Sequence, residues 1–300
     1  LSGGELQAVA IAAAVIREAD VYIFDEPSSY LDISQRMRAA RLVNSLIEDE
    51  KTVIIAEHDL AMLDYLSDQI CIFYGEPGVY GIVSHVHGVR VGVNIFLDGF
   101  IPDENMRFRD EPIRFHLRPP REPSRELEWK MEWGSMEKSF GGFRLTVAPG
   151  EITRGDLVGI VGPNGIGKTT FVKLIAGLEK LDAGEPLALT GLTISYKPQY
   201  ISATYSGTVE SLLRDIAGDR FTTEEFQNRI ILQLSLENLL DRNVENLSGG
   251  ELQRVAIAVC LSKEAQVYLL DEPSAYLDVE ERISMARAIR KIVEDREAFC

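Results

Sequence analysis

A long internal repeat constrains this chain more than any other feature of its sequence. Residues 1–32 recur 246 positions later as residues 247–278, and 22 of the 32 positions are identical. A solenoid repeats at many short intervals, whereas one long period predicts two copies of a whole domain. At the same offset the counterpart of Lys168 would precede residue 1, and that of His58 would follow residue 300. We therefore expect a fragment in which the first copy lacks its N-terminal half and the second ends early.

The composition is that of a globular protein with room for two domains. Of the 300 residues, 45% are hydrophobic and 26% are charged, which excludes collagen-like, low-complexity and disordered classes. No apolar run reaches the roughly 18 residues of a membrane span, and no secretory signal opens the chain. The three cysteines show no CxxC pair, which favours a reducing, cytoplasmic location. A net charge of −16 argues against a general coat for nucleic acids.

Strands that alternate with helices predict an α/β fold. In the second copy, Leu157–Gly162 and Val267–Leu270 are short apolar runs typical of buried parallel strands. Helical patterns cover Lys168 to about residue 177, Glu251–Ser262 and Val279–Glu294. This order indicates a parallel sheet with helices on both faces.

The segment between the two copies, residues 75–130, follows neither pattern. Six Arg and five acidic residues lie between Ile101 and Arg125, a local net charge of +1 in a chain of −16. Its prolines and charges allow the interpretation of a solvated linker. Val93–Phe100 is too apolar for a free linker, so we expect a small ordered insertion.

Residues 162–169, GPNGIGKT, fit the pattern GxxxxGK[ST] of a phosphate-binding loop between a strand and a helix. Glycines let successive N–H groups turn toward phosphate oxygens, and the helix N-terminus adds positive potential. We expect Lys168 to contact the β- and γ-phosphates and the Thr169 hydroxyl to bind Mg²⁺. The alternative is a turn that only starts a helix. The predicted ATP-binding residues here are Gly162, Pro163, Asn164, Gly165, Gly167, Lys168, Thr169 and Thr170.

Two acidic residues follow the predicted strand Val267–Leu270. Asp271 can reach a Mg²⁺ ion, and Glu272 is the candidate base that polarises an attacking water. A lone Asp-Glu pair after a strand is usually a surface turn. This pair recurs as Asp25-Glu26, with Pro following both times. We therefore expect Asp25 to bind Mg²⁺ and Glu26 to act as a second base.

His58 follows the apolar strand pattern Thr52–Ala56, 32 residues after Glu26. A lone His after a strand is usually structural or solvent-facing. At this distance from a predicted catalytic carboxylate it can instead sense a phosphate, and we expect a catalytic role of this kind for His58.

The sequence LSGGELQ occurs twice, at residues 1–7 and 247–253. Ser followed by two glycines at a helix start forms an anion-binding N-terminus. Alone, each copy could be an ordinary capped helix. Twice, in a chain with a phosphate loop, the motif predicts a clamp on the γ-phosphate. Its predicted residues are Ser2, Gly3 and Gly4 in the first copy and Ser248, Gly249 and Gly250 in the second.

Together these motifs resemble those of ATP-binding-cassette (ABC) ATPases. GPNGIGKTT at 162–170 resembles the Walker A loop, VYLLDE at 267–272 the Walker B strand, and LSGGELQ the signature sequence. Lys197-Pro198-Gln199 resembles the Q-loop, which implies that Gln199 contacts Mg²⁺ and the γ-phosphate. Phe140, 28 residues before Lys168, resembles the aromatic residue that stacks on adenine.

The resemblance implies tandem P-loop NTPase domains of α/β fold with a hinge insertion, the first domain lacking its N-terminal half. Residues 1–74 would be the C-terminal part of the first ABC domain, 75–130 the hinge and 131–300 the second ABC domain. In this family two domains face head to tail, and each ATP lies between the Walker A loop of one and the signature of the other. The chain would act as a Mg²⁺-dependent ATPase and a monomer whose cassettes pair intramolecularly.

The insertion indicates the subfamily. Tyr74–Gly81, Arg90–Gly99 and Glu104–Arg109 closely resemble the hinge of the E subfamily of ABC proteins, the ribosome-recycling factors also named RNase L inhibitors. The resemblance implies a protein that splits ribosomes after termination or rescue. Its partners would be rRNA and proteins of the ribosome, mainly of the small subunit, and a termination or rescue factor, with no membrane. Family members carry [4Fe-4S] clusters, which would lie in a domain upstream of Leu1. Ala8 departs from the Arg that is usual here.

Three other functions compete with this interpretation. The ATPase subunit of an ABC transporter would have the same cassettes, but it does not explain the hinge. An interaction protein that inhibits a nuclease would not need an intact phosphate loop and carboxylates. A DNA-repair ATPase would carry a long coiled coil between its cassette halves, and the sequence has none.

Overall fold

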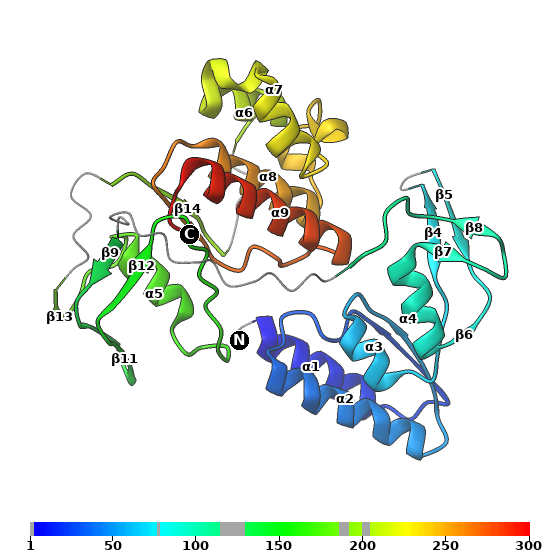
Figure 1. Ribbon diagram of the computed structural model, residues 1–300. Coiled ribbons are helices and arrows are strands. Elements are labelled where there is room, and N and C mark those ends of the chain that lie inside the picture. Colours follow the sequence, from blue (N-terminus) through cyan, green and yellow to red (C-terminus); the bar gives the residue numbers. More distant parts are fainter. Residues whose placement is uncertain (1–2, 77–78, 115–129, 186–191, 200–204) are drawn as a thin grey trace. The chain divides into compact units, whose positions relative to one another are not determined.

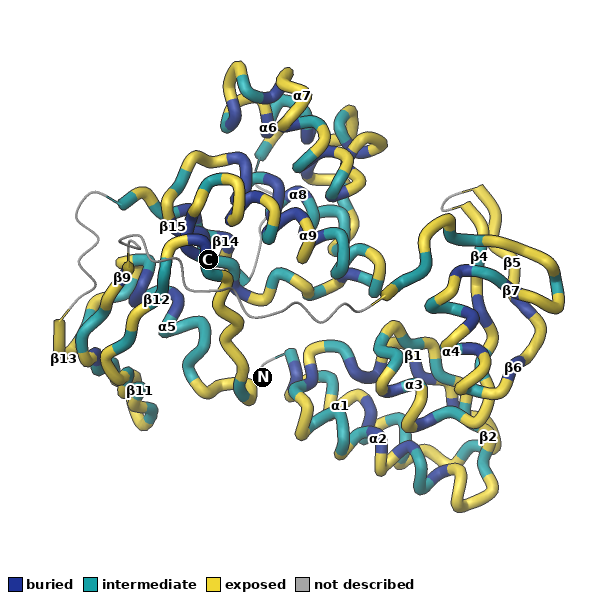
Figure 2. The backbone as a smooth tube through the Cα atoms, viewed as in Figure 1, coloured by how far each residue is buried: buried dark blue, intermediate teal, exposed yellow. Residues whose placement is uncertain are grey.

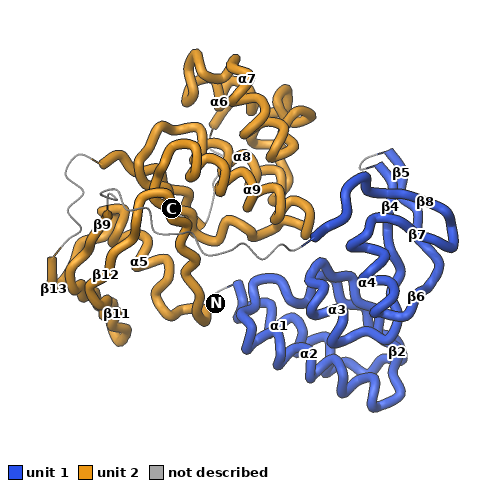
Figure 3. The backbone as a smooth tube through the Cα atoms, in the orientation of Figure 1, with its two compact units in different colours: residues 1–121 blue, residues 122–300 orange. Residues whose placement is uncertain are grey.

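The computed structural model describes residues 3–76, 79–114, 130–185, 192–199 and 205–300. The chain forms two compact units, residues 1–121 and residues 122–300 (Figure 3). Both units combine helices with strands, as the α/β prediction requires (Figure 1). Within the described ranges no helix has the length and apolarity that crossing a membrane would need.

Unit 1 begins with helices built on a parallel pair of strands. Asp25 lies opposite Ala56 at the carboxyl ends of β1 and β2, so the residues that follow both strands meet at one edge. Asp32 starts α2 with a capping box, in which its carboxylate accepts a hydrogen bond from Gln35 N. The elements are α1 (Gly3–Val15), β1 (Val21–Asp25), α2 (Ile33–Glu48), β2 (Thr52–Ala56) and α3 (Leu60–Leu66).

Residues 75–76 and 79–114 of the predicted hinge fold together with the residues just before them in unit 1. Ile72, which precedes the predicted boundary at residue 75, forms a small core with Ile95 and Ile101. The Arg109 guanidinium lies 4.9 Å from the Phe96 ring centroid and donates to Phe96 O, so this hinge arginine serves packing. The elements are β3 (Gln69–Ile70), β4 (Phe73–Glu76), β5 (Tyr80–Val83), β6 (His87–Gly88), α4 (Val89–Asp98), β7 (Phe100–Ile101) and β8 (Met106–Arg107).

Unit 2 contains two kinds of strand pairing. β15 is a parallel strand, as predicted for Val267–Leu270, and its partner is β14, with Lys197 opposite Leu270. β10 pairs antiparallel with β11 and β13, and β12 pairs antiparallel with β9, which the sequence patterns did not indicate. The strands are β9 (Lys130–Trp133), β10 (Met136–Phe140), β11 (Phe143–Val147), β12 (Gly150–Thr153), β13 (Ala183–Gly184), β14 (Ile194–Lys197) and β15 (Val267–Leu270).

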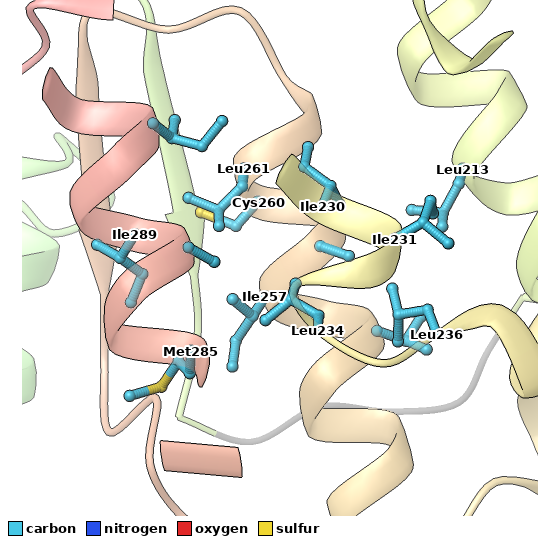
Figure 4. Packing of buried hydrophobic residues seen from close by; sticks show 14 of the residues in the cluster. Leu213, Ile230, Ile231, Leu234, Leu236, Ile257, Cys260, Leu261, Met285 and Ile289 are labelled. Carbon is cyan, nitrogen blue, oxygen red and sulfur yellow. The ribbon is translucent and has the colours of Figure 1, made fainter. Parts of the chain in front are cut away.

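The largest core of unit 2 surrounds the helix that carries the second LSGGELQ motif. α8 packs against α6, η2 and α9, and Leu213, Ile231 and Ile257 are among the buried side chains that fill the contact (Figure 4). Figure 2 shows the buried residues along α8 and α9 in dark blue. The helices are α5 (Lys168–Ile175), α6 (Val209–Ala217), η1 (Gly218–Thr222), α7 (Glu224–Phe226), η2 (Gln227–Leu232), η3 (Glu237–Leu239), η4 (Val244–Asn246), α8 (Gly249–Ser262) and α9 (Val279–Arg296).

The prediction of a β-strand at Leu157–Gly162 is wrong. Leu157–Gly162 is not a β-strand, and its Val158 and Val161 side chains are 48% and 88% exposed. Val158 N donates to Cys300 O, and Cys300 N donates to Asp156 O. A strand needs a hydrogen-bonded neighbour along its length, and these two bonds do not extend to residues 159–162.

The repeated strand is covered differently in the two units. Val267 of β15 is fully buried against Leu174 and Ile175 of α5, whereas its counterpart Val21 of β1 is 51% exposed. Unit 1 contains no second copy of residues 131–184, the segment that supplies this cover in unit 2.

Candidate nucleotide-binding site

Glycines shape the loop before α5. Gly165 and Gly167 have φ of +76° and +103°, in the left-handed region that glycine adopts without strain. A Cβ on Gly167 would also lie 3.0 Å from Phe143 Cζ and 3.1 Å from Leu145 Cδ1. The loop leads directly into α5 at Lys168, so the unpaired N–H groups of the first helical turn lie beside it. This arrangement fits an anion.

Lys168 lies across this loop. Its Nζ donates to the carbonyl oxygens of Gly162 (2.7 Å) and Pro163 (2.8 Å). A phosphate oxygen can replace these acceptors, because a charged acceptor bonds an ammonium group more strongly than a carbonyl does. Thr169 and Thr170 follow in the first turn of α5, as the motif requires.

Asp271 follows β15 and is buried, with 4% of its surface exposed. Its Oδ2 has no hydrogen-bond partner among the described residues. A buried carboxylate oxygen without a donor is costly unless a cation completes its environment, so the residues fit Mg²⁺. Thr169 and the half-buried Gln199 can add hydroxyl and amide oxygens, which Mg²⁺ accepts as ligands. In the described part of the chain, no hydrogen bond or ion pair joins Lys168 to Asp271.

Both predicted bases have the same unusual backbone. Glu26 and Glu272 have φ of 46° and 45°, although residues other than glycine rarely adopt left-handed conformations. Both side chains are exposed. In each unit a Gln from the LSGGELQ helix holds the turn: Gln7 Nε2 donates to Glu26 O (3.1 Å), and Gln253 Nε2 donates to Glu272 O (2.9 Å). The repeat in sequence is therefore also a repeat in geometry.

A buried lysine that the motifs did not identify supports the turn in unit 2. Lys197 is 1% exposed, and its Nζ donates to Asp271 O (3.0 Å) and Glu272 O (3.3 Å). Burial lowers the pKa of Lys197 to about 8, against the opposing attraction of the Asp271 and Glu272 carboxylates. A lysine at the end of the strand Ile194–Lys197 could have indicated this role, but the sequence analysis assigned a role only to Gln199.

Unit 1 brings a predicted carboxylate and histidine together. His58 Nε2 lies 3.1 Å from Glu26 Oε1, and both side chains are about half exposed. They come from the turns after β1 and β2, whose parallel register places those turns side by side. The Glu57 carboxylate accepts from Ser28 N (3.2 Å) and His58 N (3.0 Å), which ties the two turns together. Asp25 is exposed at the end of β1.

The signature glycines pack on a tyrosine of their own unit. A Cβ on Gly249 would lie 3.3 Å from Tyr276 Cδ1, and one on Gly250 would lie 2.9 Å from Tyr276 O. In unit 1 a Cβ on Gly3 would lie 3.2 Å from Tyr30 Cδ1. The two tyrosines share φ values of 63° and 64°, so they are part of the repeated geometry although no role was predicted for them.

The serine of the second signature caps its own helix. The Ser248 hydroxyl accepts from Glu251 N and forms a capping box, so here it caps α8. Gly4 is buried at the start of α1. Ser2 lies outside the described residues.

Phe140, the predicted adenine contact, ends β10 and is 45% exposed. Lys138 Nζ lies 5.0 Å from the Phe140 ring centroid. Lys138 is held by Glu179 (3.0 Å) and Asp182 (3.3 Å), and its hydrogen bond with Glu179 raises its pKa. The ring therefore has a fixed cation beside it and enough exposed surface to stack on a base.

We expect Phe140→Ala to raise the KM for ATP about 5- to 150-fold, because stacking of a base on an aromatic ring contributes ~1–3 kcal/mol. The kcat should stay close to that of the unchanged protein, because Phe140 does not touch the phosphates in the predicted arrangement. Phe140→Trp is the control, since it keeps an aromatic face. Equal KM values for the Ala and Trp variants would show that the Phe140 ring does not stack on the adenine of ATP.

Arg254 shows how the two signature helices differ. Its Nε lies 3.1 Å from Glu281 Oε1, and its Nη1 donates to Ser235 O (2.8 Å). In the first copy Ala8 and Gln35 stand at the positions of Arg254 and Glu281. Both partners of the ion pair are therefore replaced together, which leaves no unpaired charge in unit 1 at these positions.

The geometry of unit 2 defines a class of protein. A glycine loop that leads into a helix, a lysine across that loop and an acidic pair after a parallel strand are the features of a P-loop ATP-binding cassette. The ABC transporter family model matches residues 145–275, which include the loop, the second signature and both acidic residues.

Similar proteins narrow the class further. An uncharacterized ABC transporter ATP-binding protein of Methanocaldococcus jannaschii is 54% identical over 99% of this chain and 48% of its own length. ABC transporter E family member 3 of Arabidopsis thaliana is 39% identical over 51% of this chain, which covers 87% of that protein. The chain therefore belongs to the E family of ABC proteins, as the hinge resemblance predicted.

Two solved structures are similar over the whole chain. One holds the archaeal ribosome recycling factor aABCE1 in complex with the ribosomal stalk protein aP1: identity is 53%, the TM-score is 0.89, and 100% of this chain and 57% of that chain are covered. The other is a model of ribosome-bound archaeal Pelota and ABCE1, with 53% identity, a TM-score of 0.91, and 100% and 50% coverage. The chain spans about half the length of the first curated relatives that it matches.

Proposed function

We propose that the protein hydrolyses ATP and uses a twin cassette to split ribosomes into subunits after termination or rescue. The observation that carries the proposal is the similarity to an archaeal ribosome recycling factor over 100% of this chain, hinge included. A transporter cassette accounts for unit 2 but not for the hinge. The ribosome-bound relative supports the ribosome as the partner.

In the proposed reaction the phosphates of ATP occupy the loop before α5. Lys168 exchanges the carbonyls of Gly162 and Pro163 for β- and γ-phosphate oxygens. Glu272 accepts a proton from the water whose oxygen attacks the γ-phosphorus, the bond from phosphorus to the bridging oxygen breaks, and ADP leaves. Mg²⁺, when bound, supplies charge neutralisation at the phosphate oxygens.

Each proposed site combines parts of both cassettes, as in the ABC family. The first consists of Gly162–Thr170, Phe140, Gln199, Asp271 and Glu272, completed by Ser2, Gly3 and Gly4. The second contains Asp25, Glu26 and His58, completed by Ser248, Gly249 and Gly250. Thr169, Gln199 and Asp271 would hold Mg²⁺ in the first site, and Asp25 in the second. ATP binding closes the cassettes, and hydrolysis reopens them.

The protein acts in the cytoplasm, mainly on the small ribosomal subunit and together with a termination or rescue factor. Hinge arginines contact rRNA phosphates; because Arg109 serves packing, this role falls to others such as Arg114. The [4Fe-4S] clusters expected from the resemblance belong to a part of the protein upstream of Leu1.

Sedimentation of the full-length protein with ribosomes tests this function. With a non-hydrolysable ATP analogue we expect co-migration with the small subunit, and with ATP we expect loss of intact ribosomes. Without nucleotide, association should be weak. ATP hydrolysis without any ribosome association would contradict this function and favour the ATPase subunit of a transporter. Stable binding to a nuclease without ATP hydrolysis would favour the inhibitor.

A further inference from the structure

Two buried side chains from different elements hold the turn that contains Glu272. Lys197 ends β14 and donates to the carbonyl oxygens of Asp271 and Glu272 at 3.0 and 3.3 Å. Gln253, in the second turn of α8, donates to Glu272 O at 2.9 Å and to Pro273 O at 2.8 Å. Both side chains are 1% exposed. The Glu272 carbonyl therefore accepts hydrogen bonds from β14 and from the signature helix at once.

Packing alone does not explain a lysine at this position. Lysine is almost never fully buried unless it is paired, because its ammonium group loses its hydration. Methionine would fill a similar volume without that cost. Here the ammonium group reaches two main-chain carbonyls next to a candidate metal ligand and a candidate base. The position thus keeps a hydrogen-bond donor where an apolar side chain would be sufficient for packing.

The turn itself needs support. Glu272 has a φ of 45°, and non-glycine residues persist in such conformations only where the surroundings determine them. Unit 1 repeats half of the arrangement, because Gln7 donates to the carbonyl of Glu26, whose φ is 46°. The same glutamine contact at both bases indicates that it belongs to the geometry of the base rather than to local packing.

We propose that Lys197 and Gln253 are positioning residues for Glu272, holding its main chain so that the carboxylate meets the attacking water. The inference rests on the proposed ATP hydrolysis. It gives two motifs a direct connection to the base: Lys197 lies two residues before Gln199, and Gln253 lies three residues after Gly250. A displacement of either motif would move the hydrogen bonds that hold Glu272.

Lys197→Met and Gln253→Met in the full-length protein test the inference. In a Glu26→Gln background, where hydrolysis depends on Glu272 alone, each should lower kcat about 10- to 100-fold, since a small misplacement of a catalytic group has effects of that size. The KM for ATP should stay within about 3-fold because neither side chain belongs to the phosphate loop. In a Glu272→Gln background neither substitution should lower the residual rate further. Lys291→Met, an exposed position on α9, is the matched control.

The outcomes separate this inference from the proposed function. A wild-type protein without ATP hydrolysis overturns the proposed function and, with it, the inference. A loss of kcat in Glu272→Gln but not in the two Met variants overturns the inference alone. A raised KM with unchanged kcat, or a further loss in the Glu272→Gln background, would assign both residues a structural role. If the Lys197→Met protein does not fold, the kcat and KM of Gln253→Met, with Glu26→Gln and with Glu272→Gln, test the inference in the same way.

Discussion

A protein carrying both Glu26→Gln and Glu272→Gln is expected to bind ATP with near wild-type affinity and to hydrolyse it about 10²- to 10⁴-fold more slowly, the usual contribution of a general base. Glutamine keeps the size of the side chain. The contacts from Gln7 and Gln253 end on main-chain oxygens, so they survive the change. The group that accepts the proton of the water is lost, and at Glu26 the charge that faces His58 is lost with it. Nucleotide binding and single-turnover hydrolysis, measured on the same preparation, separate the two effects.

Glu237→Gln is the matched control for this pair, because Glu237 is exposed in η3 and the change removes a carboxylate in the same way. The control should hydrolyse ATP at the wild-type rate. With ATP, Glu272→Gln should stay on the small subunit, since cassettes that cannot hydrolyse cannot reopen. Wild-type hydrolysis by the double variant would contradict the assignment of both bases, and unchanged release would count against the closing motion.

Elements with a local signal could be predicted from the sequence. Thr52–Ala56 and Val267–Leu270 are strands with the expected bounds, as is typical of short apolar runs between polar turns. α8 begins at Gly249, two residues before the predicted Glu251, because Ser248 caps it. The phosphate-binding loop could be predicted as well, because its residues are contiguous in the sequence.

Elements that depend on distant partners could not be predicted. Leu157–Gly162 has the apolar pattern of a strand, but pattern does not show whether a neighbouring strand is present to pair with it. The antiparallel pairing of β12 with β9, where Gly150 lies opposite Trp133, also requires a contact that no periodicity displays. A Cβ on Gly150 would lie 2.5 Å from Trp133 Cζ2, so this glycine marks the pairing only once the structure is known.

The site residues that sequence patterns missed share a physical reason. Lys197 and Gln253 act on main-chain carbonyls, and a carbonyl is the same whichever residue carries it. Tyr276 packs on Gly249 through a left-handed turn that its own residue type does not favour. By contrast, Glu26 and His58 were predictable together, because both follow strands that pair in parallel and so end at the same edge.

Lys168→Ala is expected to lower ATP affinity at the unit 2 site about 10- to 150-fold, because a hydrogen bond to a charged group contributes ~1.5–3 kcal/mol. The change removes the ammonium group that lies across the loop and leaves Gly165 and Gly167 free to keep their turn. Because the second proposed site does not contain Lys168, the amount of nucleotide bound at saturation should fall to half of the wild-type stoichiometry.

Equilibrium binding of a fluorescent ATP analogue measures both quantities. Lys180→Ala is the matched control, since Lys180 is exposed shortly after α5 and the change removes the same charge from the same unit. A general electrostatic attraction for nucleotide would weaken binding equally in the two variants. Wild-type stoichiometry and affinity in Lys168→Ala would mean that the loop binds no phosphate. A selective loss in Lys168→Ala would instead place the phosphates within reach of its Nζ, in the loop where Gly162 and Pro163 now accept its hydrogen bonds.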